Sequence, residues 1–511
     1  MVTLQDRFKG MLAVDPQAPA IEFRGSWLSW GDLADVAKGI NEALQDIGVP
    51  TSQAVGCAIR NSGEHAAAII AFLAGDHSLL TINPLFPDET LAADLAKLRP
   101  AVVIADGQDW DRAGFKAAVG AIGAAGLELT HDRAQPIRSV PGLERPTSGD
   151  RFEGDPDVAI YMLTSGTTGA PKRVAIGRAR ILANIKGALR YQKNPAAITD
   201  PPALRSAAVI VDNPLVHMSG IWGLLNAIAG GFRVCLLEKF NVDEWRSAVA
   251  RHRPKIANLT PSSLRMVLDA GVTREELSSL TALKSGTAAL SPDLIDEALD
   301  RWGVPVLQTY GATEFTNVAG WSVGEFREHY ATHKGAVGIV NPDYEARIVD
   351  AQSGEPVPFG TEGVLELRGA HVAGDQWLRT TDRAVLDADR FLWIKGRVDN
   401  VIIRGGFKVH GEDVQRTLEQ HPSVREACVV GVPDERLGNV PVAAVVLQAG
   451  ADLTEEGLKA WAREQLLPYQ VPTAFRFVAD LPRTQSMKPM LPAVRELFAA
   501  PRATQSEDSS R

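Results

Sequence analysis

The chain alternates between short apolar runs and amphipathic segments, and this alternation limits the folds that it can adopt. Strands that alternate with helices build parallel sheets with helices on both faces. Thr260-Pro261 and Ser291-Pro292 each place a helix-capping residue before a proline at the first helical position. We therefore expect a doubly wound sheet, with functional loops at the carboxyl ends of its strands. Its strand-like runs are 208–211, 233–237 and 256–259, and the helical patterns between them are 220–229 and 242–251.

The same alternation begins near the N-terminus. Residues 33–44 carry apolar side chains at helical spacing, with strand-like runs at 55–59 and 101–105. From about residue 335 to residue 396 short strands and turns replace this pattern, which favours a small β-barrel or sandwich. A compact α/β pattern follows Arg397, with helical segments at 412–421 and 454–466 and strand-like runs at 427–432, 440–447 and 475–478.

These patterns predict an α/β protein of two domains. The large N-terminal domain, residues 1–398, would combine doubly wound sheets with the small β-barrel at about 335–396. A small α/β C-terminal domain would cover residues 399–502, and the polar tail 503–511 is expected to be disordered. A length of 511 residues agrees with more than one hydrophobic core.

The composition argues against several other classes of protein. The formal net charge is −9 and no dense block of Lys and Arg occurs, which argues against nonspecific nucleic-acid binding. Cys57, Cys235 and Cys428 stand far apart in apolar contexts, as buried cysteines do in a reducing compartment. No apolar run is long enough to span a bilayer, and the N-terminus lacks the apolar core of a signal peptide. We therefore expect a cytoplasmic protein.

A loop rich in glycine and hydroxyl residues, 164–172, interrupts two extended apolar runs. Its glycines would let backbone N–H groups approach an anion, and Lys172 would add a positive charge, so the loop is suited to bind phosphate. It is not a Walker A loop, because Ala170-Pro171 separates Gly169 from the lysine and no Ser or Thr follows it. A polar hairpin turn would explain the glycines but not the density of hydroxyl donors.

This loop resembles the phosphate loop of the acyl-adenylate-forming superfamily. That superfamily contains the acyl- and aryl-CoA ligases, the adenylation domains of peptide synthetases, and firefly luciferase. Arg173 stands where the family usually has a glycine. The resemblance implies that ATP and Mg²⁺ are bound, that Thr164 also acts in catalysis, and that the phosphates contact Thr164, Ser165, Gly166, Thr167, Thr168, Gly169 and Lys172.

Two further segments resemble the nucleotide site of the family. In Tyr310-Gly311-Ala312-Thr313-Glu314, the resemblance implies that Tyr310 stacks on adenine and that Glu314 binds Mg²⁺ and acts in catalysis. Without the resemblance, a glutamate after a turn is usually only solvated. The second segment, Ser285-Gly286-Thr287-Ala288, resembles the small-residue segment that flanks adenine and the acyl group, with Thr287 in place of a glycine. The nucleotide contacts implied here are Gly286, Thr287, Ala288, Tyr310, Gly311 and Thr313.

A third group of matches lies where the two predicted domains meet. The resemblance implies that Asp382 binds the ribose with help from Arg397, although an ordinary surface pair is the alternative. Thr381 stands where the family has a glycine. Asp399 is implied to be the hinge of a mobile C-terminal domain. Gly405-Gly406 would then line the tunnel for coenzyme A, or alternatively form a simple turn or bulge.

Near the C-terminus, Pro482-Arg483-Thr484-Gln485-Ser486-Met487-Lys488 resembles the catalytic-lysine loop of the family, with Met487 in place of a glycine. The resemblance assigns to Lys488 the stabilisation of charge at the α-phosphate during adenylation. A lone lysine close to a C-terminus would otherwise be expected to be solvated.

The segment Asn213 to Gly220 bears on the acid that is activated. His217 stands in the region where amino-acid-activating members carry an aspartate, and no acidic residue follows it in this segment, which disfavours an amino acid. The resemblance to fatty- and aryl-CoA ligases implies that His217 contacts the carboxylate or acyl group and acts in catalysis, whereas a structural histidine is the alternative. The residues expected to bind the acid are His217, Met218, Ile221, Trp222, Ser285, Gly286, Gly311 and Phe315.

The resemblance spans residues 164–488 and implies an AMP-forming acyl- or aryl-CoA ligase. The favoured substrate is a hydrophobic, aromatic acid, with a medium-chain or alicyclic acid as the alternative. Loading of a separate carrier protein instead of CoA is a second alternative. An inactive nucleotide-binding homologue is a third, because four residues depart from family glycines. The expected partners are a small carboxylic acid and CoA, with no nucleic acid and no membrane span, and a homodimer is left open.

Overall fold

The computed structural model describes residues 2–164, 172–188, 202–286, 288–312, 315, 317–369, 376–484 and 487–499. The chain divides into two compact units, Met1–Thr332 and His333–Arg511. This division groups the β-rich segment 335–396 with the C-terminal residues rather than with the first domain. The predicted domain boundary at residues 398 and 399 therefore stays a prediction.

The first unit contains a seven-stranded sheet in the order β7-β6-β5-β3-β4-β8-β9. Its central strands are parallel, as the strand–helix alternation predicts, and β7 and β9 add antiparallel edges. The strands are β3 (Val55–Ala58), β4 (Leu79–Ile82), β5 (Val102–Asp106), β6 (Ala125–Leu129), β7 (Ile137–Ser139), β8 (Val158–Thr164) and β9 (Lys172–Gly177).

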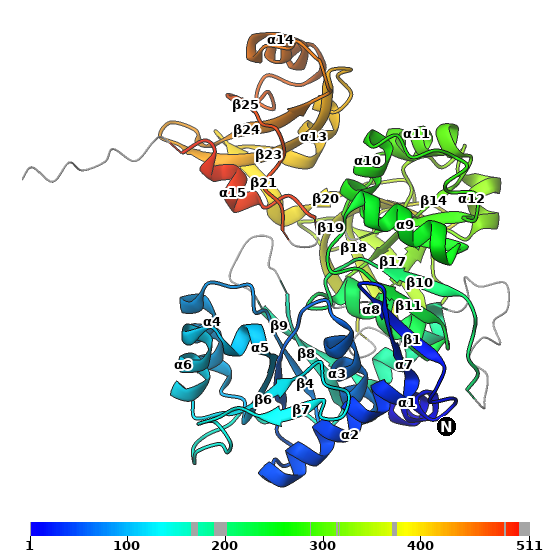
Figure 1. The fold of residues 1–511 in the computed structure, drawn as a ribbon. Coiled ribbons are helices and arrows are strands. Elements are labelled where there is room, and N and C mark those ends of the chain that lie inside the picture. Colours follow the sequence, from blue (N-terminus) through cyan, green and yellow to red (C-terminus); the bar gives the residue numbers. More distant parts are fainter. Residues whose placement is uncertain are drawn as a thin grey trace, which may run out of the picture. The chain divides into compact units, whose positions relative to one another are not determined.

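Helices cover both faces of this sheet (Figure 1). One apolar cluster joins the sheet to the first three helices, and a second joins its other face to α4 and α6. The helices are α1 (Leu4–Leu12), α2 (Trp30–Ile47), α3 (Gly63–Ala74), α4 (Asp88–Leu98), α5 (Gly107–Trp110), α6 (Ala113–Ala121) and α7 (Arg178–Ala188).

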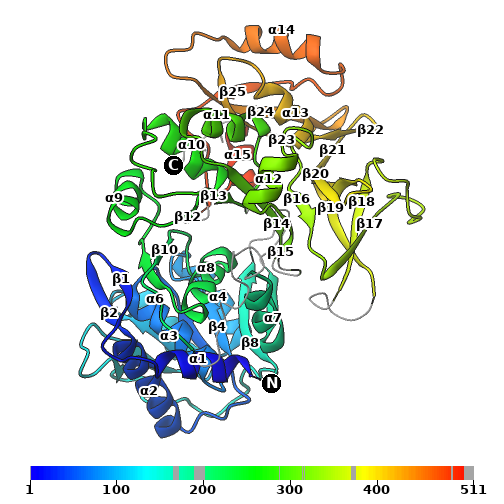
Figure 2. The same cartoon turned by 90° about the vertical axis from the view of Figure 1, so that its right-hand side faces the viewer.

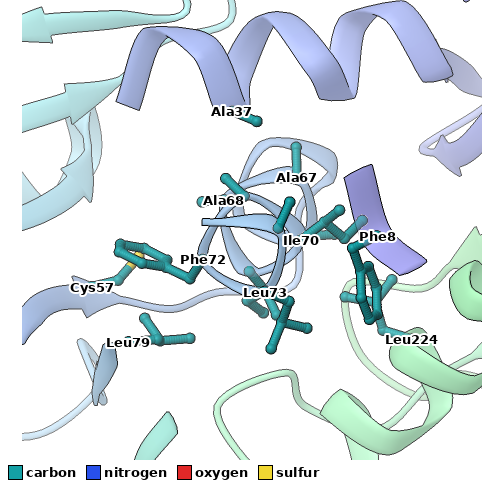
Figure 3. Close-up of a cluster of buried hydrophobic side chains, with 14 of the residues drawn as sticks. Phe8, Ala37, Cys57, Ala67, Ala68, Ile70, Phe72, Leu73, Leu79 and Leu224 are labelled. Atoms are coloured by element: carbon teal, nitrogen blue, oxygen red, sulfur yellow. The ribbon is translucent and has the colours of Figure 1, made fainter. Parts of the chain in front are cut away.

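Helix α3 lies at the centre of the larger cluster. Every residue of α3 except Glu64 is buried, because the helix carries apolar side chains on all its sides rather than along one stripe. Figure 3 shows α3 enclosed by side chains from several other elements: Phe8, Ala37, Cys57, Leu79 and Leu224.

A second sheet of the first unit has the order β10-β11-β1-β2. Strands β10, β11 and β1 are parallel, and β2 pairs with β1 in the antiparallel direction. Its strands are β1 (Pro19–Phe23), β2 (Ser26–Ser29), β10 (Ala208–Val211) and β11 (Arg233–Leu236), and the helices after β10 and β11 are α8 (Met218–Ala229) and α9 (Val242–His252).

The remaining strands of the first unit run side by side in the order β12-β13-β14-β15. The first three are parallel, and β15 is antiparallel to β14. Thr260 and Ser291 cap α10 and α11 through their side chains, which confirms both predicted helix starts. The elements are β12 (Ile256–Asn258), α10 (Pro261–Asp269), β13 (Ala282–Ser285), α11 (Pro292–Trp302), β14 (Val306–Gly311), β15 (Asn317–Gly320) and α12 (Val323–His329).

The second unit begins with five antiparallel strands in the order β16-β20-β19-β18-β17, which lie side by side in Figure 2. The β-rich prediction is confirmed. Among the residues that the structure describes, however, no pairing between β16 and β17 closes these strands into the predicted barrel. The strands are β16 (Gly338–Val340), β17 (Tyr344–Val349), β18 (Gly363–Gly369), β19 (Leu378–Leu386) and β20 (Phe391–Arg397).

The C-terminal part of this unit forms the predicted α/β arrangement around a sheet in the order β22-β21-β24-β23, with β25 paired to β24. None of the described helices, here or in the first unit, is both long and apolar enough to cross a membrane. The elements are η3 (Val398–Asn400), β21 (Val401–Arg404), β22 (Phe407–His410), α13 (Gly411–Leu418), β23 (Val424–Asp434), β24 (Gly438–Leu447), α14 (Glu455–Gln465), β25 (Phe475–Phe477) and α15 (Leu491–Glu496).

Candidate functional site

The predicted phosphate loop connects β8 to β9. Thr164 and Lys172 are paired residues of these antiparallel strands, so the two ends of the loop lie opposite each other beyond the carboxyl end of β8. Ser165, Gly166, Thr167, Thr168 and Gly169 lie outside the described residues, as do the side chains of Thr164 and Lys172. The phosphate contacts predicted for this loop therefore stay predictions.

Arg173, the residue after the loop, turns toward the interior of the first unit. Its Nη2 lies 2.8 Å from a carboxylate oxygen of Asp94 on α4, and its Nη1 donates a 2.7 Å hydrogen bond to the carbonyl oxygen of Thr81. Burial lowers the pKa of Arg173 and raises that of Asp94, which shows that desolvation opposes the charged form of each partner. Arg173 is thus a structural anchor at the base of the loop rather than a solvated substitute for glycine.

Two buried side chains, Ser285 and Gln308, mark the place where the pairing of β13 with β14 ends. Ser285 is 2% exposed and Gln308 is 6% exposed, and these two residues are directly paired neighbours in the parallel strands. Neither Oγ of Ser285 nor Oε1 of Gln308 has a hydrogen-bond partner among the residues that the structure describes. The same holds for Oδ1 of Asn317, a buried atom at the start of β15. Buried polar atoms normally have partners, so this edge is suited to receive a polar ligand.

The predicted adenine-binding residues lie at the same edge. Tyr310 and Gly311 end β14, and the ring of Tyr310 lies 5.9 Å from that of the buried Phe315. Gly286 follows β13, and a side-chain carbon at this position would come within 2.8 Å of the hydroxyl of Thr309. This close approach explains the need for glycine. Ala288 is described and half-buried, whereas the predicted contacts Thr287, Thr313 and Glu314 lie outside the described residues.

The predicted acid-binding segment connects β10 to α8. His217 is the N-cap residue of α8, and its backbone N–H donates a 3.0 Å hydrogen bond to the carbonyl oxygen of Pro214. Met218 and Trp222, one turn apart, are partly buried against the apolar core. Ile221 is fully buried within that core, so it supports the segment from behind in this structure.

Asp212, immediately before this segment, is a candidate functional residue that the sequence patterns did not indicate. It is 6% exposed, and burial raises the pKa of its carboxyl group to about 7. Nδ2 of Asn213 donates a 3.2 Å hydrogen bond to it. A single aspartate at a strand end is usually solvated, so only its polarity beside an apolar strand could have marked it. Gln308 was missed for a similar reason, because it is a lone polar residue within an apolar strand.

The second unit brings together three of the predicted residues. Asp382 on β19 and Arg397 on β20 are directly paired, and their charged groups lie 4.0 Å apart. Burial, and then the positive charge of nearby Arg397, lower the pKa of Lys488. A lysine placed beside an arginine is suited to bind an anion that neither charge could hold as tightly alone.

The catalytic-lysine loop is held by Arg483, which binds Glu426 on β23 with both terminal nitrogens at 3.2 and 2.5 Å. The loop closes through a hydrogen bond from the Thr484 N–H to the carbonyl oxygen of Lys488, 2.8 Å long. Met487 has a φ of 62°, in the left-handed region that favours glycine. This explains why the family has a glycine here, and why methionine introduces strain.

Gly405 and Gly406 form the two-residue turn between β21 and β22. Their φ angles are 55° and 88°, as the turn of a tight hairpin requires. The turn is therefore part of the fold, and its predicted contact with coenzyme A stays a prediction. Asp399 lies in the short helix η3 between the two sheets of the unit, and its side chain lies outside the described residues.

All three cysteines are buried, as predicted. The donor atoms of Cys235, Glu22 and His252 lie within 4.8 Å of one another, a spacing that the sequence did not reveal. Glu22 lies beside His252 and also accepts a 3.0 Å hydrogen bond from Arg251, so the carboxylate already has a positively charged neighbour within the protein.

Comparisons with known proteins agree with this arrangement. The model of the AMP-binding enzyme family matches residues 8–375, and that of the AMP-binding enzyme C-terminal domain matches residues 413–488. Indoleacetate–CoA ligase of Aromatoleum aromaticum is 28% identical over 520 residues, covering 97% of each protein. Long-chain-fatty-acid–CoA ligase of Bacillus subtilis is 29% identical over 354 residues, covering 65% of this chain and 60% of that protein.

Among solved structures, amide bond synthetase McbA from Marinactinospora thermotolerans is similar with a TM-score of 0.79 and 26% identity, covering 97% of this chain and 100% of that chain. The chain therefore belongs to the AMP-binding enzyme family, within the acyl-adenylate-forming superfamily. The family and these relatives support an AMP-forming acid–CoA ligase.

Proposed function

We propose that this enzyme activates a hydrophobic carboxylic acid, with an aromatic acid favoured, and transfers it to coenzyme A. A carboxylate oxygen would bond to the α-phosphorus of ATP as the bond to the bridging oxygen breaks, giving an acyl-adenylate and pyrophosphate. The CoA thiolate would then attack the acyl carbon and release AMP. The partly buried side chains of Met218 and Trp222, together with Phe315, support an apolar acid.

The observation that carries this proposal is that two buried atoms, Oγ of Ser285 on β13 and Oε1 of Gln308 on β14, have no partner among the described residues. A buried polar atom without a partner destabilises the ligand-free protein by about 1–3 kcal/mol. Such a cost is consistent with an atom that receives its partner from a ligand. Gly286 and Tyr310 flank this pair, and both belong to segments that resemble the adenine- and acyl-binding part of the family.

The other predicted residues have separate tasks. Asp382 would accept the ribose hydroxyl groups, Arg397 would help to hold the nucleotide, and Lys488 would stabilise negative charge on the α-phosphate. Glu314 would hold Mg²⁺, which when bound offsets the negative charge of the phosphates. We place this reaction in the cytoplasm.

The proposal is tested by pyrophosphate release with a panel of aromatic, medium-chain and alicyclic acids, with and without CoA. We expect release with an aromatic acid and a CoA thioester as the product. Release without a thioester would indicate a carrier protein or another acceptor. No release with any acid would support an inactive homologue.

Ser285→Ala tests the carrying observation directly. Because this change removes a buried hydroxyl that has no partner among the described residues, we expect stability to be unchanged or slightly higher, but adenylation to be slower. The matched control is Ser279→Ala, since Oγ of Ser279 is also buried and unpaired but lies outside the predicted site. Equal activity of the two variants would contradict the role given to Ser285.

A further inference from the structure

We infer that Asn61 is a positioning residue that fixes the start of the predicted acid-binding segment, Asn213 to Gly220. This inference rests on the proposed function, because it concerns the binding of the acid. Asn61 lies between β3 and α3, about 150 residues before that segment in sequence, yet its side-chain amide is bonded to the segment at two points.

The amide group of Asn61 makes three hydrogen bonds. Its Oδ1 accepts from the backbone N–H of Leu215 at 2.7 Å. Its Nδ2 donates to the carbonyl oxygens of Asn213 at 3.1 Å and of Leu237 at 2.9 Å. Asn61 is 8% exposed, so water cannot readily replace these bonds. The pattern needs one acceptor and two donors in one planar group, which an asparagine side chain provides.

These bonds connect the carboxyl ends of strands from two different sheets. Asn61 follows β3 of the seven-stranded sheet, Asn213 and Leu215 follow β10, and Leu237 follows β11 of the four-stranded sheet. Loops at the carboxyl ends of strands carry binding residues in folds of this kind. Asn61 therefore fixes one such loop against a rigid part of the other sheet.

The consequence for the acid follows from the position of His217. Fixing the backbone at Asn213 and Leu215 also fixes Pro214, whose carbonyl oxygen accepts the hydrogen bond from the N–H of His217. His217 is the N-cap residue of α8, so its position sets where the helix begins and therefore where Met218, its first residue, lies. A side chain that binds a substrate must be held within a fraction of an ångström of its binding position by the residues around it. Asn61 supplies that support without contacting the substrate itself.

Asn61→Ala removes all three bonds, whereas Asn61→Asp keeps the acceptor for Leu215 and replaces both donors with a carboxylate oxygen. Because a buried hydrogen bond changes an equilibrium by roughly five-fold, we expect Asn61→Ala to raise the KM for the acid about ten-fold or more. The KM for ATP should change by less than about two-fold, because ATP is assigned to other segments. Asn61→Asp should raise the KM for the acid as well.

The matched control is Asn83→Ala. Asn83 is 7% exposed and follows β4, next to β3, but its Oδ1 accepts from the nearby N–H of Leu85 instead of holding a distant loop. The Asn83→Ala variant should therefore be less stable but should show no selective rise in the KM for the acid. Hydrogen exchange provides a second measurement, since exchange at 213–217 should become faster in Asn61→Ala than in Asn83→Ala.

Equal changes of the two KM values in Asn61→Ala, or unchanged KM values with reduced stability alone, would overturn the inference. Either result is distinguishable from failure of the proposed function. If the proposed function fails, the unmodified enzyme itself releases no pyrophosphate with any acid. The positioning role is then tested by hydrogen exchange alone, and unaltered exchange at 213–217 in Asn61→Ala would overturn it.

Discussion

Replacing Arg173 by methionine tests whether this departure from a family glycine stabilises the fold. Methionine keeps an aliphatic side chain in the strand but removes the guanidinium group. Asp94 would then keep its negative charge in a partly buried site, since its side chain is only 17% exposed. The carbonyl oxygen of Thr81 would lose its hydrogen bond from Nη1.

The expected loss follows from this burial. Removing one partner of a fully buried ion pair typically destabilises a protein by about 3–5 kcal/mol. Arg173 and Asp94 retain 13% and 17% exposure, so we expect the lower end of that range, about 3 kcal/mol. Adding Asp94→Asn should recover part of the loss, because no unpaired charge would then remain.

Urea unfolding followed by tryptophan fluorescence measures this effect. The control is Arg246→Met, because Arg246 and Glu276 form a pair in the same unit in which both side chains are 35% exposed. A pair of this kind contributes less than about 1 kcal/mol. If Arg173→Met costs no more than Arg246→Met, or if Asp94→Asn adds a further full loss, the reasoning about the buried pair is refuted.

Three other predictions concern single residues. Lys488→Ala should slow adenylation by about 10²-fold or more, while CoA should still react with a supplied acyl-adenylate. The control is Lys408→Ala, because Lys408 is exposed, and equal adenylation rates of the two variants would contradict the role of Lys488. Met487→Gly should relieve the strain of the left-handed backbone at this position and raise the free energy of unfolding by about 1 kcal/mol, measured by thermal unfolding. Met490→Gly should not, because Met490 has a φ of −90°. The raised pKa of Asp212, about 7 against 3.8, means that the folded state holds a proton that the unfolded state has lost. The free energy of unfolding should therefore fall by up to about 4 kcal/mol between pH 4 and 7, and Asp212→Asn should remove this fall. If stability changes with pH in the same way in the variant and in the unmodified protein, the role of Asp212 is refuted.

Local patterns in the sequence were sufficient for most of the fold. The strand 208–211 and the helix starts at Thr260 and Ser291 follow from periodicity and capping, which depend on residues close together in the chain. Closure of a β-barrel depends instead on which distant strand pairs with the edge. The sequence could not reveal that the pairing among the described strands leaves the sheet open.

For the candidate site, motifs located the segments but not their supporting contacts. Asp94 lies 79 residues from Arg173, and Asn61 lies 152 residues from Asn213. No periodicity connects residues so far apart, so these partners were not predictable. The strain at Met487 was only indirectly visible, as a departure from glycine whose backbone angle the sequence does not give.

If a ligand supplies the partners that Ser285 and Gln308 lack among the described residues, the amount of folded protein in a cell would depend on that ligand. A ligand that binds only the folded state and satisfies these atoms shifts the folding equilibrium by mass action. When the supply of that ligand falls, a larger fraction of the chains unfolds transiently and becomes open to proteolysis. The amount of enzyme would then follow the availability of its own substrates, without any separate regulatory site.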